Sequence, residues 1–188
     1  MKNVYLMALT ALMVCACAEK PVDPVAEAIV AEMMKEIDQP YEIKVENLQK
    51  LDSTTYATEF ARRIEIYDTR LDQNTARMEK YIRERKPKNA TKVFQELQRD
   101  TKIFNELNAM KEMMGDDTLK IAYYDYAYTY SGKVGDKKIA PKSAFATVTP
   151  AGKILTYASD RKDLHKATGL AIPGYKELLE SFKEPEEE

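Results

Sequence analysis

Two long amphipathic stripes in the middle of the chain constrain its fold more than any other feature. Apolar residues recur at helical spacing over residues 60–82 and 94–114: Phe60, Ile64, Tyr67, Leu71, Met78, Ile82, Phe94, Leu97, Phe104, Leu107 and Met114. A polar residue, Asn74 or Thr75, interrupts the first stripe. Pro87 separates the stripes, because proline cannot continue a helix interior, and Gly115 ends the second. The sequence therefore predicts two long helices that pack antiparallel as a hairpin.

The segments on either side predict strands and two short helices. Residues 41–51, 119–130, 144–149 and 153–157 alternate as strands do, and residues 150–152 form a turn. Residues 25–37 and 174–182 have helical spacing, whereas the lysine-rich residues 131–141 predict a polar connection. We expect an α+β fold: a long antiparallel helix hairpin packed on a small, mostly antiparallel sheet, with short N- and C-terminal helices. In this arrangement the helices cover one face of the sheet.

The N-terminus has the layout of a secretory signal. Lys2 precedes an apolar run over residues 4–14, which is too short to cross a bilayer. The residues Val14-Cys15-Ala16-Cys17 that follow resemble the lipobox of bacterial lipoproteins. The resemblance implies that one cysteine becomes the first mature residue and carries acyl chains. We assign this role to Cys17, which follows the small Ala16. Cys15 is the alternative, with a leucine three residues before it but the bulky Val14 directly before it.

This assignment divides the chain into four parts. Residues 1–16 are a signal peptide, residues 17–24 the lipidated cysteine and a tether, residues 25–183 a single α+β domain, and residues 184–188 a charged tail. Both cysteines lie in the signal region, so the domain forms no internal disulfide. With 29 Lys and Arg against 31 Asp and Glu, the chain has no strongly basic field that would hold nucleic acid. We also expect no metal and no cofactor.

Five tyrosines between residues 123 and 130 form the most unusual cluster. Alternation puts Tyr124, Tyr126, Tyr128 and Tyr130 on one face of a strand. One interpretation is an aromatic platform that binds a sugar or a protein, because tyrosine combines a large contact area with a polar tip. The other, which we favour, is that the rings pack on the helix hairpin as part of the core.

Signatures of catalysis are missing. His165 is the one histidine, it lies in a polar stretch, and we expect a surface or helix-capping role for it. No G-x-S-x-G motif is present. The acidic residues Glu65, Asp68 and Asp72 alternate with arginines, which favours a solvated ion-pair face. Asp116 and Asp117 lack the spacing of a calcium loop.

The sequence thus favours a lipid-anchored protein of a Gram-negative cell envelope, held in the outer membrane. In the lipoprotein family, an aspartate directly after the cysteine often marks retention in the inner membrane. This chain has Ala18 at that position, which favours the outer membrane. We expect a non-catalytic binding or assembly module whose partner is a protein or a glycan. The alternatives are a carboxylate-based hydrolase and a structural spacer or inhibitor. The basic residues 133–142 are expected to be a solvated loop, with contact to acidic lipid or an anionic glycan as the alternative.

Overall fold

The computed structural model describes residues 23–35, 37–166 and 168–182. The predicted signal peptide, Cys15, Cys17 and the charged tail lie outside these residues. The elements in chain order are α1 (Pro24–Met33), β1 (Tyr41–Thr55), α2 (Tyr56–Arg83), α3 (Pro87–Met114), η1 (Gly115–Leu119), β2 (Ile121–Val134), β3 (Lys137–Val148), β4 (Ile154–Ala158), η2 (Arg161–Lys166), η3 (Thr168–Ala171) and α4 (Tyr175–Glu180). They confirm the α+β class, with two long packed helices, a four-stranded antiparallel sheet and short helices at both ends.

Helices α2 and α3 form the predicted hairpin, and each contains 28 residues. Helix α2 follows β1 directly, and the side chain of Thr55 caps it by accepting a hydrogen bond from the backbone N–H of Thr58 at 3.3 Å. Helix α3 begins at Pro87, whose fixed φ suits the first turn of a helix. The connection between the two helices is therefore short.

One polar layer crosses the hairpin core. Of the two candidates for the interruption in the first stripe, the structure buries Asn74 and leaves Thr75 exposed. The Asn74 amide donates to the buried carboxylate of Asp100 at 3.4 Å, and Arg70 donates to the same carboxylate at 3.0 Å. The polar interruption is thus paired across the two helices.

The sheet has the order β1-β2-β3-β4, so β1 and β4 are its edge strands. It is longer than the sequence predicted. Residues 52–55 belong to β1, and most of the lysine-rich residues 131–141 belong to β2 and β3, which turn at Gly135 and Asp136. Residues 131–141 lie at the end of the sheet where most side chains are exposed, so the strands need no apolar side there. Residues 52–55 lie at the opposite end, where they pair with the start of β2 and Thr54 is buried. At Gly132 the strands approach so closely that a Cβ atom would lie 1.9 Å from the carbonyl oxygen of Glu42.

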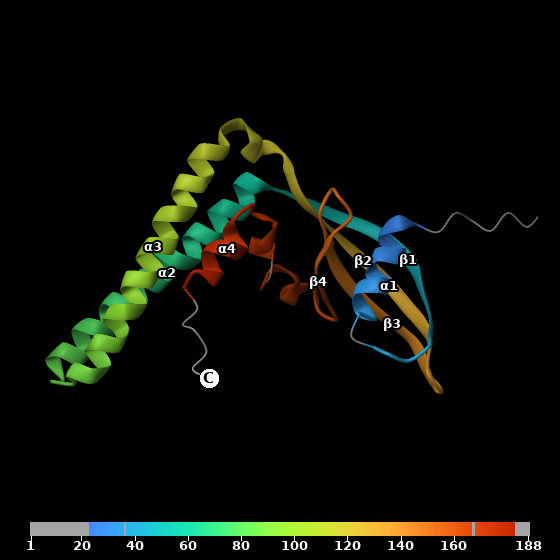
Figure 1. Cartoon of the computed structure of the whole chain (residues 1–188), viewed down its shortest axis with the longest axis horizontal. Coiled ribbons are helices and arrows are strands. Elements are labelled where there is room, and N and C mark those ends of the chain that lie inside the picture. Colours follow the sequence, from blue (N-terminus) through green and yellow to red (C-terminus); the bar gives the residue numbers. More distant parts are fainter. Residues whose placement is uncertain (1–22, 36, 167, 183–188) are drawn as a thin grey trace, which may run out of the picture.

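The described part of the chain has the shape of a V (Figure 1). One arm is the α2–α3 hairpin, and the other is the sheet with α1 packed on one of its faces. The two arms meet where β1 runs into α2 and where α3 returns through η1 to β2. This arrangement differs from the expected one, in which the helices cover one face of the sheet. The hairpin meets the sheet at the apex of the V, and α1 covers the face instead. The direct β1–α2 junction explains it, since no loop is present to fold the helix back.

Each arm has its own apolar core. In the sheet arm, Ile29 of α1 packs on Tyr128, Ala144, Ala146, Val148 and Ile154. The C-terminal segment consists of η2, η3 and α4. In the hairpin arm, its residues Ile172 and Tyr175 pack against Phe60, Tyr67, Ile103 and Leu107. That segment also contacts β3 and β4 through η2, so it bridges the two arms. Among the described helices, none is long and apolar enough to span a membrane.

Candidate functional site

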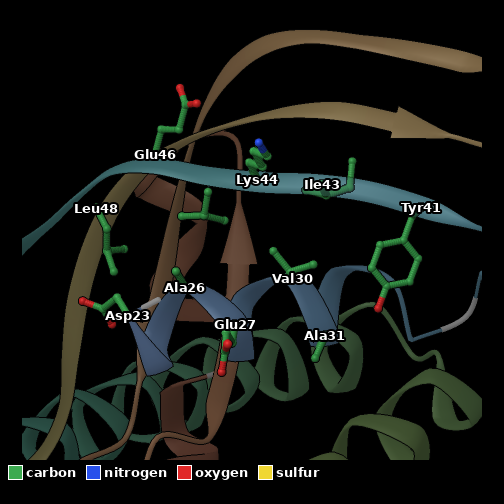
Figure 2. A pocket seen from close by; sticks show the side chains of 11 residues that line it. Asp23, Ala26, Glu27, Val30, Ala31, Tyr41, Ile43, Lys44, Glu46 and Leu48 are labelled. Carbon is green, nitrogen blue, oxygen red and sulfur yellow. The ribbon is translucent and has the colours of Figure 1, made fainter. Parts of the chain in front are cut away.

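A groove of about 570 Å³ runs between α1 and the edge strand β1 (Figure 2). Figure 2 shows Tyr41 and Leu48 pointing from the strand towards the helix, and Ala26 and Val30 rising from the helix towards the strand. The volume falls in the range of small-molecule and peptide-side-chain pockets. The groove is mostly apolar and open along one side, so it suits an elongated ligand better than an enclosed one.

Local sequence features position both walls of the groove. The Asp23 side chain accepts a hydrogen bond from the backbone N–H of Val25 at 2.8 Å, and Pro24 fits the first helical position. On the strand side, Asn47 has a φ of 52° and interrupts the pairing of β1 with β2. This bulge shifts the alternation of the strand by one residue, so Val45 and Leu48 both pack towards α1.

The rim of the groove is acidic. Asp23, Glu27 and Glu46 line it together with one cation, Lys44. Figure 2 shows Glu46 and Glu27 pointing away from the apolar interior, at its opposite borders. A ligand with apolar side chains and a positive charge beside them complements this pattern.

The sequence did not predict this groove. Its apolar residues read as ordinary core positions of a short helix and a half-buried strand. The available signal was the width of the apolar stripe on α1, because Ala26, Val30 and Ala31 add apolar positions that one flat packing face does not use. Their partner, β1, was known only after the tertiary structure placed it beside α1.

The four predicted tyrosines lie on the face of β2 that α1 covers. Tyr128 is almost completely buried, and its hydroxyl lies 3.6 Å from the sulfur of Met33. Tyr126 and Tyr130 are half-buried against the same core. Tyr124 stands apart, with the Lys50 ammonium 4.1 Å from the centre of its ring. The rings thus pack chiefly on α1, not on the helix hairpin that we expected them to contact.

A second groove, of about 380 Å³, lies on the other side of α1 and contains two of these tyrosines. Tyr128 and Tyr130 line it together with Lys142 and the exposed Tyr157 of β4. The structure therefore brings Tyr128 and Tyr130 to a surface depression, while Tyr124 lines neither of the two grooves. A binding role for the four rings remains a prediction.

A buried polar cluster joins the two arms at the base of the hairpin. The Glu59 carboxylate is fully buried and accepts hydrogen bonds from Arg62 at 2.6 Å, Arg63 at 2.7 Å, Tyr123 at 2.8 Å and Thr168 at 3.0 Å. Burial raises the pKa of the Tyr123 hydroxyl, and the nearby Glu59 charge adds to this effect. All of these groups satisfy one another, which is the signature of a structural joint.

The sequence did not reveal Glu59, because the nearby arginines were expected to pair with Glu65, Asp68 and Asp72 instead. Arg62 and Arg63 pair with Glu59, whereas Glu65, Asp68 and Asp72 are exposed and form no ion pair within the described residues. The signal was the position of Glu59, which lies next to Phe60 on the core-facing stripe with Arg63 one turn later.

His165 lies at the same junction and is half-buried. Its Nε2 atom is 4.0 Å from the buried carboxylate of Asp125, which accepts a hydrogen bond from Thr147 at 3.0 Å. Its position is thus less exposed than the sequence suggested.

Asp117 forms an ion pair with Lys120 at 2.8 Å. Across the described part of the chain, no group of three or more His, Cys, Asp or Glu side chains is placed to hold a metal ion.

Neither groove contains one of the buried carboxylates, since Glu59, Asp100 and Asp125 line neither of them. The site with the clearest shape is therefore the α1–β1 groove, an apolar channel with an acidic rim beside a free sheet edge. In comparisons with protein-family models, curated proteins and solved structures, no match to this chain was found.

Proposed function

We propose that this chain is a lipid-anchored protein of the bacterial cell envelope whose domain binds an extended segment of a partner protein. The lipid is attached at Cys17, and the binding site is the groove between α1 and β1. The observation that carries the binding proposal is the position of this groove beside the edge strand β1, which pairs with β2 on one side and with no described strand on the other.

An edge strand can accept a further strand, and the groove supplies pockets for its side chains. Tyr41 to Glu46 pair with β2 without a register shift, so the free side of this segment presents regular backbone N–H and C=O groups. A partner strand that adds here places every second side chain against the apolar groove. The acidic rim favours a partner segment that carries Lys or Arg next to its apolar residues.

The arrangement of carboxylates supports binding over hydrolysis. A carboxylate-based hydrolase requires two carboxyl groups that face the same cleft. The fully buried carboxylates, Glu59 and Asp100, hold arginines at short distance, and Asp125 accepts from Thr147. In the α1–β1 groove, Asp23 caps α1, and Glu27 and Glu46 point away from the interior at its opposite borders. Asp23 and the three buried carboxylates thus form hydrogen bonds and ion pairs that stabilise the fold.

Site-specific photocrosslinking in growing cells tests the binding site. A benzoyl-phenylalanine residue at Ala31, an exposed position in the wall of the groove, is expected to form an adduct with an envelope protein. The same residue at Glu65, exposed on the hairpin, is the matched control. Equal adducts at both positions, or an adduct with glycan alone, would contradict a protein-binding groove.

Metabolic labelling with a clickable fatty acid tests the lipid anchor. The label is expected on the wild type and on Cys15→Ala, and it should be lost in Cys17→Ala. Label that persists in Cys17→Ala but disappears in Cys15→Ala moves the modification to the alternative cysteine. Absence of label from the wild type overturns the lipoprotein assignment. The binding groove is tested independently of this result, by the crosslinking experiment.

A further inference from the structure

Both ends of the V are basic. The end of the hairpin, residues 79–92, carries Lys80, Arg83, Arg85, Lys86, Lys88 and Lys92 against Glu79 and Glu84. The end of the sheet, residues 131–142, carries Lys133, Lys137, Lys138 and Lys142 against Asp136, and Glu42 of β1 lies opposite Lys133 in the strand register. All ten basic side chains are exposed. The chain as a whole is slightly acidic, so positive charge is concentrated at these two places.

Most of these charges are not neutralised by neighbours. At the hairpin end, Lys80 and Lys86 share Glu84, with N–O distances of 4.0 and 2.8 Å. Arg83, Arg85 and Lys88 form no ion pair with any other described residue, and the same holds for Lys92 and for the four lysines of the sheet end. In a protein where many surface arginines pair with acids, both ends remain available to an anionic partner.

The two ends lie on the same side of the molecule. Figure 1 views the chain down its shortest axis, with the apex of the V at the top and both ends at the bottom. Each hairpin helix has 28 residues and therefore spans roughly 40 Å, at about 1.5 Å per residue. Because the two ends belong to separate arms and lie on one side of the molecule, an extended plane suits them better than a compact ligand.

The hairpin end also presents an apolar side chain among its cations. Ile82 is 61% exposed and lies next to Arg83. At the sheet end, the half-buried Ile139 follows Lys138 and lines a shallow depression with it. Aliphatic side chains beside Lys and Arg suit a bilayer interface, where the cations meet phosphates and the apolar groups enter the headgroup region.

We propose that the hairpin end and the sheet end dock together on an anionic phospholipid surface. The surface charge attracts both clusters, and the V geometry lets them touch one plane at the same time. This contact is separate from the proposed lipid at Cys17 and from the α1–β1 groove. It concerns the body of the protein, so it is tested on a chain from which both cysteines have been removed.

The experiment is vesicle flotation of the full chain carrying Cys15→Ser and Cys17→Ser. Vesicles of phosphatidylcholine alone are compared with vesicles that also contain phosphatidylglycerol. Because the apolar residues 4–14 are common to every variant, binding to neutral vesicles measures their contribution. We expect stronger binding to the anionic vesicles, weakened by salt, because the attraction is electrostatic.

Three triple variants change the charge by the same amount at different places. The hairpin-end variant is Arg83→Gln/Arg85→Gln/Lys88→Gln, and the sheet-end variant is Lys133→Gln/Lys137→Gln/Lys138→Gln. The control, Lys102→Gln/Lys111→Gln/Lys153→Gln, removes exposed lysines away from both ends. Each end variant should weaken binding to anionic vesicles about tenfold or more, and the control should change it little.

The outcomes separate the proposal from its rivals. Loss of binding in both end variants but not in the control, with unchanged circular dichroism, supports docking through two ends. Equal losses in all three variants would show attraction to net charge alone and overturn the proposal. Loss in one end variant only would overturn the two-ended contact, and so would equal binding to neutral and anionic vesicles.

Discussion

Glu59 holds a negative charge where water does not reach it, and its partners come from three different segments. Arg62 and Arg63 lie on the same helix, Tyr123 on β2, and Thr168 in η3. A buried ion pair of this kind adds little net stability when it is complete, but breaking it leaves an uncompensated charge. At the scale of single residues, this carboxylate is the position where the structure is most sensitive.

Glu59→Gln is expected to lower the free energy of unfolding by about 3–5 kcal/mol, because Arg63, only 7% exposed, keeps its charge without a counter-ion. Urea unfolding of the full chain measures this difference. Glu65→Gln is the matched control, an exposed glutamate on the same helix, and it should change stability by less than about 0.5 kcal/mol. Similar losses in both variants would show that Glu59 is not a joint.

The buried tyrosine hydroxyls make the fold sensitive to alkali. Burial raises the pKa of Tyr128 and of Tyr175, where a hydrogen bond with Tyr67 adds to the effect. An unfolded chain loses these protons near pH 10, before the folded chain does. The stabilising contribution is therefore complete below about pH 10 and is lost as the pH rises above it.

Tyr128→Phe removes one of these hydroxyls while keeping the ring in the core. We expect little change in stability at neutral pH, and a smaller loss of stability between about pH 9 and about pH 11 than in the wild type. Melting temperatures across this range measure both quantities. Tyr41→Phe, at an exposed position, should retain the wild-type slope. An unchanged slope in Tyr128→Phe would contradict the raised pKa.

At the scale of elements, the hairpin shows how a sequence pattern translates into packing. The near-heptad stripe predicted two antiparallel helices and one polar interruption, and the structure confirms both. The pairing of Asn74 with Asp100 was not predictable, because the predicted stripe of α3 began at Phe94, which is 50% exposed, whereas the structure buries Val93, Asp100, Ile103 and Leu107. A buried polar layer of this kind selects one register of two helices at some cost in stability.

Removing the layer tests this role. Asp100→Leu alone leaves the Asn74 amide buried without its partner, and it should cost about 1–3 kcal/mol. The double variant Asn74→Leu/Asp100→Leu replaces both by apolar groups and should be less destabilised than the single variant. A double-mutant cycle measured by urea unfolding gives the coupling between the two residues. Additive losses would show that the layer does not act as a unit.

The strands show where pattern reading stops. Residues 41–51 and 119–130 alternate and were predicted as strands. The structure confirms the first, and it confirms the second from Ile121 onwards, since Leu119 belongs to η1. The lysine-rich residues 131–141 were predicted as a polar connection, yet most of them extend the sheet, and β1 continues through residues 52–55 beyond its predicted end. Alternation reveals a strand only where one face is buried, and most side chains of residues 131–141 are exposed.

At the scale of the whole molecule, the C-terminal segment sets the relation between the arms. Ile172 and Tyr175 pack into the core of the hairpin, while η2 contacts β3 and β4. Arg63 adds a hydrogen bond of 2.7 Å to the carbonyl oxygen of His165. This segment thus holds the two arms together in addition to the direct β1–α2 junction.

Ile172→Ala should loosen this joint while both arms keep their own folds. Spin labels at Arg85 and Lys137, in the background without native cysteines, report the distance between the two ends. We expect a narrow distance distribution in the wild type and a broader one in Ile172→Ala. Ile29→Ala, an equally buried isoleucine in the sheet arm, loses similar stability but should keep the narrow distribution. Broadening in both variants would contradict a specific role for Ile172.

The sequence by itself determined the local elements and the class of the fold. Apolar spacing over residues 60–82 and 94–114 specified two helices, because a helix buries one stripe every three to four residues. Alternation specified most of the sheet. Pro87 and Gly115 marked helix ends through backbone geometry alone. These features depend on neighbours in the chain, so they are readable without tertiary structure.

Only the tertiary structure decided how these elements meet. The α1–β1 groove joins two segments whose patterns both resemble ordinary core, and the Glu59 cluster joins residues more than one hundred positions apart, such as Thr168. The V shape follows from the direct passage of β1 into α2 and from the bridge made by the C-terminal segment. Periodicity tells which side of an element is buried, but it does not tell against what, because many partners satisfy the same apolar stripe.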